Sequence, residues 1–460
     1  MKYVLYRIET YGMKNIKNKI TLDFCPLTID NKSNKKVSKV KAIYGANGSG
    51  KSAILNSIRL FKMLVINENL LKQTSEIKKL NKIINKQINE FYISVVYSVK
   101  YDMIYNDEIY KNEFIVKLDN GIPYIESEKF YTLKGKSING EYSLIYEANN
   151  GTLKITNKES KMDEYFVNRT LNILKYSSCS SITSENDVIK EINKYLIEND
   201  NYSSKQMVLD SLGVLKYLII NRDFANNISI YLEEQDMHKE FDDDMFEKYL
   251  EKINNKDNES MIRNTIGSNI DIIRKSGRDF NGLVITNLDL YKNNIKRLTT
   301  FLQLFKPTLK EIKLEIKEDE QFYYCNKKMV YDGYTIDSDY ESTGIQKLMN
   351  IYNSIEDVTK GKMVFIDELD ANISGIYLEK LIEYLNDLNK GQLCFTTHDY
   401  YLMKTLSDYT NALDFLGEKG KLVSWTKNGN YKPYNQYPEG MIMDSPYNIE
   451  ALDFARLFNK

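Results

Sequence analysis

The chain has 460 residues, a formal net charge of −1, 28% charged residues and 42% hydrophobic residues. The balanced charge excludes a histone-like protein that binds nucleic acid through bulk positive charge, and the apolar fraction suffices for a large core. No apolar run reaches the roughly 18 residues of a membrane helix, and the first residues lack the apolar core of a signal peptide. The four cysteines show no metal-binding spacing. We therefore expect a cytoplasmic protein of about three domains.

The first third of the chain alternates polar and apolar residues, which predicts strands. Residues 3–24 are expected to form a strand pair, and residues 40–44 a short strand that runs into a glycine-rich turn. Helical spacing of apolar residues begins at Ser52. Residues 91–147 are rich in Tyr, Ile, Val and Phe, with turns at Asn120-Gly121 and Asn139-Gly140, so we expect an antiparallel β region there.

The middle of the chain differs in character. Asn, Asp, Glu and Lys dominate residues 160–275, and helical periods appear in 186–198 and 205–221. The acidic run at 233–251 is interpreted as a solvated helix face. No motif in this region indicates a chemical function, so it is interpreted as an insertion.

The last third returns to strands that alternate with helices. Residues 283–315 are predicted to be helical and then extended, and residues 363–366 form a continuous apolar run typical of a buried strand. A helix is expected at 376–388 and another short strand at 393–397. Such alternation at both ends of a chain favours a parallel α/β core.

A phosphate-binding loop is the most specific motif in the chain. Its pattern, GxxxxGK[ST], lies between a predicted strand and a predicted helix, where its glycines can turn several N–H groups toward one anion. The helix that follows adds its positive N-terminal end. Lys51 is expected to reach the β- and γ-phosphates, and Ser52 to ligate magnesium. The expected nucleotide-binding residues are Gly45, Ala46, Asn47, Gly48, Ser49, Gly50, Lys51, Ser52 and Ala53.

Acidic and basic side chains follow two of the later apolar strands. Asp367 and Glu368 come directly after the strand at 363–366, at the end where open α/β sheets bind ligands. We expect Asp367 to hold magnesium and Glu368 to act as the general base toward water. His398 follows the strand at 393–397 and could bond the γ-phosphate. His238, the other histidine, lies in the acidic run and is interpreted as a surface residue.

Together these motifs resemble the ATP-binding-cassette ATPases, in the soluble SMC, RecF and OLD-like branch. The likeness is closest to the stand-alone AAA-type ATPases of bacterial phage-defence and abortive-infection systems, such as PARIS and Septu. It implies an α/β fold: an ABC-ATPase head with a mixed β-sheet, a phosphate-loop core and an antiparallel β subdomain, plus a mainly helical insertion. The implied division is an N-terminal lobe at 1–155, the insertion at 156–288 and a C-terminal lobe at 289–460.

The resemblance also implies a signature segment that contacts the nucleotide of a partner protomer. Ser342 and Gly344, just before a predicted helix, occupy that position, although the motif is degenerate. Asp370 lies in the segment that resembles the loop crossing between protomers. Many relatives carry a histidine a few residues later, where this chain has Ile373-Ser374-Gly375.

Two further assignments follow from the resemblance alone. Gln87 is preferred over Gln73 as the magnesium-sensing glutamine, because it precedes the strand at Phe91. Arg7, in the opening strand, is expected near the adenine or a phosphate.

The function implied by the resemblance is an ATPase, with ATP and Mg²⁺ as cofactors, that works as a head-to-tail dimer or a larger assembly. As a sensor and switch in anti-phage defence, it would control a separate effector such as a nuclease and could respond to a phage-encoded trigger. After His398 the chain shows no Toprim pattern, so we expect no nuclease in it. A RecF-like or SMC-like repair or chromosome-maintenance ATPase that binds DNA through Lys14–Lys41 is the alternative. Intact motifs argue against a scaffold with a vestigial site, and the large insertion argues against a transporter subunit.

Overall fold

The computed structural model consists of two compact units. The first holds Met1–Ile230, Asp357–Asp367 and Ile382–Lys460, and the second holds Tyr231–Glu356 and Glu368–Leu381. No helix among the described residues is long and apolar enough to cross a membrane. The structure describes residues 2–24, 39–100, 108–134, 138–156, 167, 174–182, 213–232, 273–274, 281–284, 288–318, 322–409, 411–417, 420–425, 432–437 and 442.

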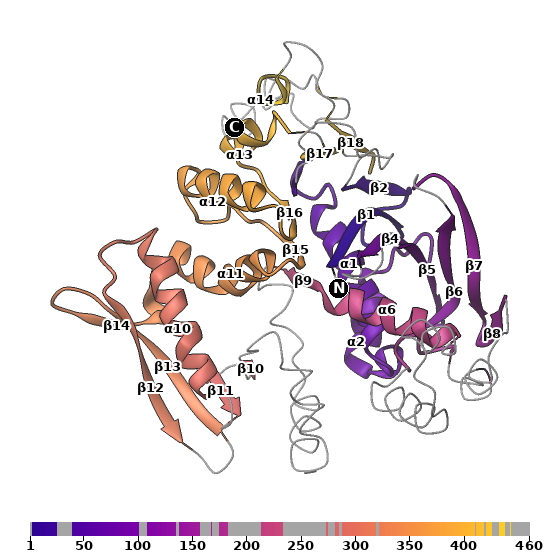
Figure 1. The fold of residues 1–460 in the computed structure, drawn as a ribbon, viewed down its shortest axis with the longest axis horizontal. Helices are drawn as coiled ribbons and strands as arrows, with labels where there is room; N and C mark the ends of the chain where they lie inside the picture. Colours follow the sequence, from indigo (N-terminus) through magenta and orange to yellow (C-terminus); the bar gives the residue numbers. More distant parts are fainter. Residues whose placement is uncertain are drawn as a thin grey trace, which may run out of the picture. The chain divides into compact units, whose positions relative to one another are not determined.

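A seven-stranded antiparallel sheet dominates the first unit (Figure 1). At the Asn120-Gly121 turn the backbone φ values are 50° and 80°, as a tight mirror-image hairpin turn requires. This sheet confirms the predicted strand pair at 3–24 and the β region at 91–147. In spatial order its strands are β2 (Ile20–Asp23), β1 (Lys2–Tyr11), β4 (Glu90–Lys100), β5 (Glu108–Asp119), β6 (Ile122–Lys134), β7 (Glu141–Asn149) and β8 (Thr152–Ile155).

The second sheet of this unit is mixed and carries the predicted motifs. Parallel pairing joins its four central strands, β17, β3, β16 and β15, every residue of which is buried. Continuous apolar runs of this kind are typical of parallel strands covered on both faces. In spatial order the sheet consists of β18 (Leu422–Ser424), β17 (Leu413–Leu416), β3 (Val40–Gly45), β16 (Gln392–Thr396), β15 (Met363–Ile366) and β9 (Ile228–Tyr231).

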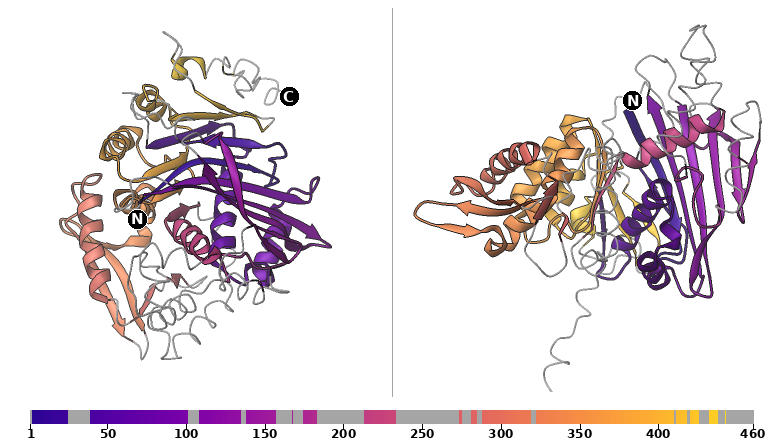
Figure 2. Two further views of the ribbon diagram at one scale, coloured as in Figure 1. Left: turned by 45° about the vertical axis from the view of Figure 1, so that its right-hand side comes forward. Right: turned by 90° about the horizontal axis from the view of Figure 1, so that it is seen from below.

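Aromatic packing fixes helices α1 (Lys51–Ile66) and α6 (Val214–Asn226) on one face of the antiparallel sheet, as the right-hand view of Figure 2 shows. Phe224 stacks on Tyr97 with ring centroids 3.6 Å apart, and Phe61 meets Phe114 edge to face at 6.0 Å. Among the described residues, the other helices that lie wholly in this unit are η1 (Leu70–Lys72), α2 (Thr74–Ile83), α13 (Tyr400–Leu406) and α14 (Pro433–Gln436).

A buried glutamine side chain joins the two sheets. The amide of Gln392 in β16 bonds both backbone groups of Leu5, accepting from its N–H at 2.7 Å and donating to its carbonyl at 2.9 Å. The pairing of β1 with β4 shifts register between Leu5 and Arg7. Gln392 therefore hydrogen-bonds the backbone N–H and carbonyl of Leu5 where the strand pairing is irregular. Leaving these buried groups without partners would destabilise the fold.

The second unit is built around a five-stranded antiparallel sheet. Its strands are β10 (Ile273–Arg274), β11 (Asn281–Val284), β13 (Phe322–Val330) and β12 (Glu311–Glu318) in spatial order, with β14 (Thr335–Asp337) also paired to β13. Phe301 of α10 (Leu288–Gln303) packs on Tyr352 of α11 (Thr343–Thr359), with ring centroids 5.2 Å apart. The single-turn helix η4 (Ser338–Tyr340) precedes α11, and α12 (Gly375–Leu388) begins in this unit.

The α/β fold, with an antiparallel sheet beside a mixed phosphate-loop sheet, confirms the expected fold class. The helices expected at 376–388 and from Ser52 are α12 and α1, and the helix-then-strand expectation for 283–315 is met by α10 and β12. The helix expected at 186–198, the acidic run at 233–251 and His238 lie outside the described residues. Because most of 156–288 does so too, the helical insertion and the three-part division stay predictions.

Candidate functional site

Three strand ends meet in the mixed sheet of the first unit. Since β3, β16 and β15 run parallel and adjacent, their carboxyl ends lie at one edge. The phosphate loop follows β3, His398 follows β16, and Asp367 follows β15. Sheets of this kind bind ligands at that edge.

The phosphate loop takes a conformation that only glycine adopts easily. Gly48 and Gly50 have φ values of 78° and 113°. A Cβ atom on Gly50 would lie 2.9 Å from Asn15 Oδ1, while Asn15 Nδ2 donates to the Gly48 carbonyl at 2.7 Å. Helix α1 begins at Lys51, so its first N–H groups lie at the end of this turn. The loop has the backbone needed to hold a phosphate.

Lys51 is the charged centre of the loop. Lys51 is only 7% exposed. Its Nζ donates to the carbonyls of Gly45 at 2.8 Å and Ala46 at 3.1 Å. Nζ also lies 3.0 Å from Nε2 of His398. Because an ammonium group can only donate, Nε2 must accept, which places the proton of a neutral His398 on Nδ1. The structure therefore brings together two predicted site residues, Lys51 and His398.

Asp367 is buried beside the third strand of the site. Only 3% of the residue is exposed, and its Oδ1 accepts a 2.6 Å hydrogen bond from Thr396 Oγ1 at the end of β16. A buried carboxylate needs such donors to keep its position and charge. Thr396 thus orients the carboxylate that we expect to hold magnesium.

The segment after β16 is held by two hydrogen bonds at Asp399, the residue that follows His398. Tyr44 Oη donates to the carbonyl of Asp399 at 2.9 Å, and Asp399 Oδ1 caps α13 by accepting from the Tyr401 N–H at 2.7 Å. These bonds fix the backbone that carries the imidazole.

Glu368 has an unusual backbone conformation. Its φ of 47° lies in the left-handed region, and Asn372 in the same loop has a φ of 61°. Such conformations cost a non-glycine residue about 1–3 kcal/mol and concentrate at functional sites. Within the loop the Glu368 carbonyl accepts from the Ala371 N–H at 3.1 Å, and the Asp370 carbonyl accepts from Ile373 at 3.2 Å. The role of Glu368 as general base stays a prediction.

The predicted signature residues lie at the start of α11 in the second unit. Ser342 directly precedes the helix, and its carbonyl accepts from the Gln346 N–H at 3.0 Å. A Cβ atom on Gly344 would lie 2.4 Å from the Asn372 carbonyl oxygen. Glycine is therefore required at position 344 for the loop at 372 to approach the helix this closely.

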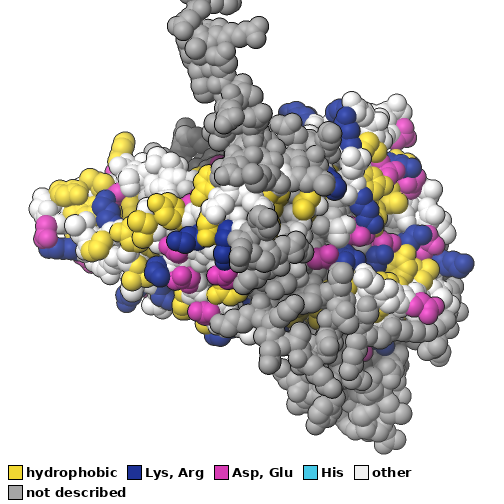
Figure 3. Space-filling model, turned by 90° about the horizontal axis from the view of Figure 1, so that it is seen from above, with side chains coloured by type: hydrophobic (Ala, Val, Ile, Leu, Met, Phe, Trp, Pro, Cys, Tyr) yellow, Lys and Arg dark blue, Asp and Glu magenta, His cyan; other side chains and the backbone are white. Residues whose placement is uncertain are grey.

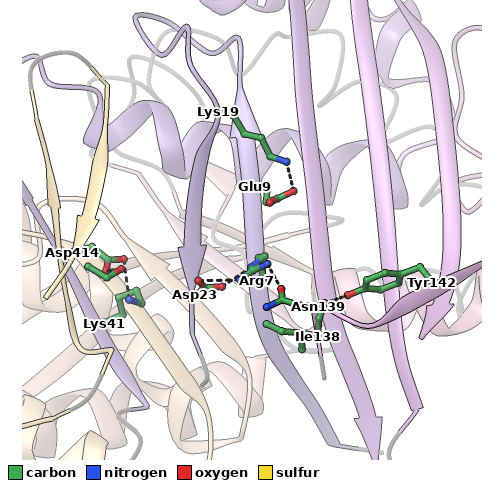
Figure 4. Close-up of polar contacts among 10 residues, drawn as sticks. Arg7, Glu9, Lys19, Asp23, Lys41, Ile138, Asn139, Tyr142 and Asp414 are labelled. Carbon is green, nitrogen blue, oxygen red and sulfur yellow. Dashed lines mark hydrogen bonds and ion pairs between the residues drawn. The ribbon is translucent and has the colours of Figure 1, made fainter. Parts of the chain in front are cut away.

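Arg7 and Gln87 both make hydrogen bonds to neighbouring residues of the first unit. Arg7 pairs with Asp23 through Nε at 2.6 Å and also donates to Asn139 Oδ1 at 3.0 Å (Figure 4). Gln87 is exposed in the turn before β4, and its N–H donates to Asn85 Oδ1 at 3.0 Å. Their nucleotide and magnesium roles stay predictions.

The residues present fit a nucleotide with its metal ion. Among the described residues no three or more His, Cys, Asp or Glu side chains cluster to hold a metal on their own. Magnesium that accompanies ATP takes most ligands from phosphates and water, and needs only one or two protein groups. Ser52 at the start of α1 and the buried Asp367 therefore remain its predicted ligands.

Residues 41–404 match the protein family described as "AAA domain, putative AbiEii toxin, Type IV TA system". The chain belongs to this AAA-domain family. The match spans the phosphate loop and the strands β15 and β16, which precede Asp367 and His398. The family match thus agrees with the nucleotide binding that the phosphate loop suggests. No curated protein matches the chain.

Solved structures of SMC head domains are similar to this AAA-domain protein. One is the head from Pyrococcus furiosus with an extended coiled coil, bound to the C-terminal domain of ScpA. It is 15% identical, with 92% of this chain and 96% of that chain covered and a TM-score of 0.39. The SMC head from Thermotoga maritima is 12% identical over 93% and 100% of the chains, with a TM-score of 0.32.

Sequence reasoning overlooked three residues that shape the sites. Thr396 holds Asp367, Asn15 holds the phosphate loop, and Glu341 accepts from the Ser342 N–H at 2.9 Å. Thr396 had a detectable signal, since it ends the strand before His398. The other two contact motif residues, Gly48 and Ser342, but lie at positions that the motif patterns do not specify.

Proposed function

We propose that this AAA-domain protein binds and hydrolyses ATP as a dimeric or larger switch in anti-phage defence, and that it controls a separate effector such as a nuclease. The observation that carries the proposal is the 3.0 Å contact between Lys51 Nζ and His398 Nε2 inside a glycine-built phosphate loop. The family description, which names a toxin of a type IV toxin–antitoxin system, supports a defence role.

The chemistry follows from what each side chain can do. Lys51 exchanges loop carbonyls for β- and γ-phosphate oxygens, and the N–H groups at the start of α1 bind the same anion. His398 contacts the γ-phosphate. Glu368 takes a proton from water as the water oxygen bonds the γ-phosphorus, and the bond to the β-phosphate oxygen breaks to release ADP. Bound magnesium supplies charge neutralisation, and Ser52 and Asp367 are the residues that would hold it.

In this proposal two copies meet head to tail. Each ATP lies between Gly45–Ser52 of one copy and Ser342–Gly344 of the other, with Asp370 in the loop that crosses between them. ATP binding closes the dimer and hydrolysis opens it, so the nucleotide state would set whether the effector is held or released.

The deciding experiment is steady-state ATP hydrolysis by purified protein, with and without duplex DNA. Turnover should vanish in Glu368→Gln, which should still bind ATP, and Lys51→Ala should abolish nucleotide binding. Lys72→Ala, a change at an exposed lysine, is the matched control and should behave as wild type. Wild-type turnover in Glu368→Gln would remove that residue from its role.

DNA stimulation separates the defence switch from the repair alternative. Lys14–Lys41 holds eight lysines against two aspartates. Among the described ones, Lys19 pairs with Glu9 at 2.7 Å and Lys41 with the buried Asp414 at 2.9 Å. On the face drawn in Figure 3, positive and negative side chains are interspersed. Strong DNA-stimulated turnover that is lost in Glu368→Gln would favour the repair function, whereas turnover indifferent to DNA would favour the switch.

A further inference from the structure

Glu341 is a buried carboxylate directly before the proposed signature serine. Only 2% of its side chain is exposed, although burying a charge without partners costs several kcal/mol. A buried carboxylate of this kind needs hydrogen-bond donors and a positive charge around it. The expected ATP chemistry does not use Glu341.

Three donors from different parts of the second unit converge on this carboxylate. Lys306, just after α10, lies 3.0 Å and 3.2 Å from its two oxygens. Tyr331, just after β13, donates its hydroxyl to Oε1, and the Ser342 N–H donates to Oε2 at 2.9 Å. Burial raises the pKa of Glu341, but the bonds from Tyr331 and Ser342 and the charge of Lys306 outweigh burial and leave that pKa below its ordinary value.

The contacts connect the signature segment to the body of the second unit. Lys306 Nζ also lies 4.5 Å from the ring centroid of Tyr331, so the donors support each other. Gln346 in α11 folds back and donates to the carbonyls of Asp339 at 2.7 Å and Glu341 at 3.1 Å. The start of α11 is therefore fixed from both sides.

Lys306 also reduces the electrostatic repulsion between the Glu341 carboxylate and an anion at the start of α11. The N-terminal end of α11 attracts an anion, but a bare carboxylate next to Ser342 would repel it. The ammonium of Lys306 neutralises that carboxylate. The Ser342 amide is taken by Glu341, which leaves the Ser342 hydroxyl and the next N–H groups of the first turn to meet a phosphate.

We propose that Glu341, neutralised by Lys306, is a positioning residue that holds Ser342 and the first turn of α11 ready for the γ-phosphate of ATP bound to a second copy of this chain. The inference rests on the proposed function. It names the residues that make one copy a competent partner for the other.

The test measures ATP-dependent dimerisation of the full chain in a Glu368→Gln background by analytical ultracentrifugation, with ATP and Mg²⁺. Glu341→Ala should raise the protein concentration for half-dimerisation at least tenfold. Glu341→Gln should stay within about threefold of the parent, because its amide can accept from Ser342 and donate to the Tyr331 hydroxyl. Lys306→Met should also lose tenfold or more, and adding Glu341→Gln to it should recover most of that loss.

Two controls separate positioning from general damage. Binding of a fluorescent ATP analogue, read below the dimerisation range, should stay within twofold of the parent in every variant, because the phosphate loop is intact. Asp332→Asn removes a carboxylate that is 88% exposed and adjacent to Tyr331, and should change nothing.

The outcomes distinguish the inference from the function beneath it. Parental dimerisation in folded Glu341→Ala and Lys306→Met overturns the inference and leaves the proposed function standing. Equal losses in Glu341→Gln and Glu341→Ala overturn it as well. A parent that does not dimerise with ATP refutes the proposed function and the inference together. If Glu341→Ala does not fold, Lys306→Met decides, since that side chain is 31% exposed and the carboxylate that it leaves keeps its bonds from Tyr331 and the Ser342 N–H.

Discussion

Thr396 illustrates how a single hydroxyl can orient a carboxylate that we expect to bind magnesium. Its 2.6 Å bond to Asp367 joins two buried residues on neighbouring strands. A hydrogen bond to a charged group contributes about 1.5–3 kcal/mol, and groups that orient a metal ligand alter metal affinity by roughly 10–100-fold. At this scale the site depends on the partner of Asp367 as much as on Asp367.

Thr396→Val should therefore weaken magnesium use while the shape of the strand is kept. We expect the Mg²⁺ concentration for half-maximal ATP hydrolysis to rise about tenfold. A magnesium titration of turnover measures this, with Thr300→Val on the exposed face of α10 as control. An unchanged magnesium dependence in Thr396→Val would show that the hydroxyl does not support the metal site.

At the scale of elements, backbone geometry and strand pairing set the phosphate loop. Gly50 combines a left-handed φ with the close approach of Asn15, and β3, which leads into the loop, is joined to β17 by an ion pair. Both features lie outside the atoms that would touch ATP, yet both hold the loop.

Gly50→Ala should destroy nucleotide binding. The left-handed φ of 113° costs an alanine about 1–2 kcal/mol, and its Cβ would press on Asn15 at 2.9 Å. Gly333→Ala is the matched control, because its φ of 81° imposes a similar torsional cost with nothing within 4 Å of the added Cβ. Calorimetric ATP titration should show binding lost only in Gly50→Ala. ATP affinity retained there would contradict the steric argument.

The ion pair between Lys41 and Asp414 should show strong coupling. The two side chains are 3% and 0% exposed and lie 2.9 Å apart (Figure 4). Asp414 also accepts from Ser424 Oγ. Removing one partner leaves a buried charge, so Lys41→Met should cost about 3–5 kcal/mol. Lys41→Met with Asp414→Val should regain most of that stability in urea unfolding. Additive losses would mean that the pair is not coupled.

At the scale of the whole first unit, one buried polar network connects the antiparallel sheet to its helices. Glu128 of β6 accepts from Tyr146 Oη and from the Cys179 N–H, each at 2.8 Å. The segment around Cys179 also bonds both helices. Ser178 Oγ donates to the Leu64 carbonyl of α1, and Ser180 Oγ accepts from Asn221 Nδ2 of α6. Burial raises the pKa of Glu128 to about 7, despite these hydrogen bonds.

Glu128 should make stability fall as pH rises. Its pKa is raised above the unfolded value of 4.5, so its contribution is complete below about pH 4.5 and is lost as pH rises through 7. The shift corresponds to roughly 3 kcal/mol. Glu128→Gln, which can bond the same partners, should flatten this part of the profile in thermal unfolding between pH 5 and 8. An unchanged slope would mean that Glu128 is not the titrating group.

Local chemistry explains what the sequence predicted well. The apolar run of β15 with Asp367 after it, the glycines around Lys51 and the Asn120-Gly121 turn each depend on neighbours in the chain, so their elements were predictable. The parallel α/β core followed from the alternation of those elements, and the ABC-ATPase head from the resemblance. The structure brings Lys51 and His398 into contact, whereas the roles of the candidate site residues, Arg7 and Gln87 among them, stay predictions.

What the tertiary structure decided is which distant residues meet. Because β16 lies between β3 and β15, Thr396 contacts Asp367 and His398 contacts Lys51. Local periodicity does not predict the order of strands in a sheet. The burial of Glu341 likewise depends on Lys306 and Tyr331, which arrive from other elements. The sequence by itself determined the phosphate-binding motif and the elements around it, because spacing and turn chemistry act locally. Partners, burial and pKa shifts required the packed fold, because they arise only when separated segments exclude water together.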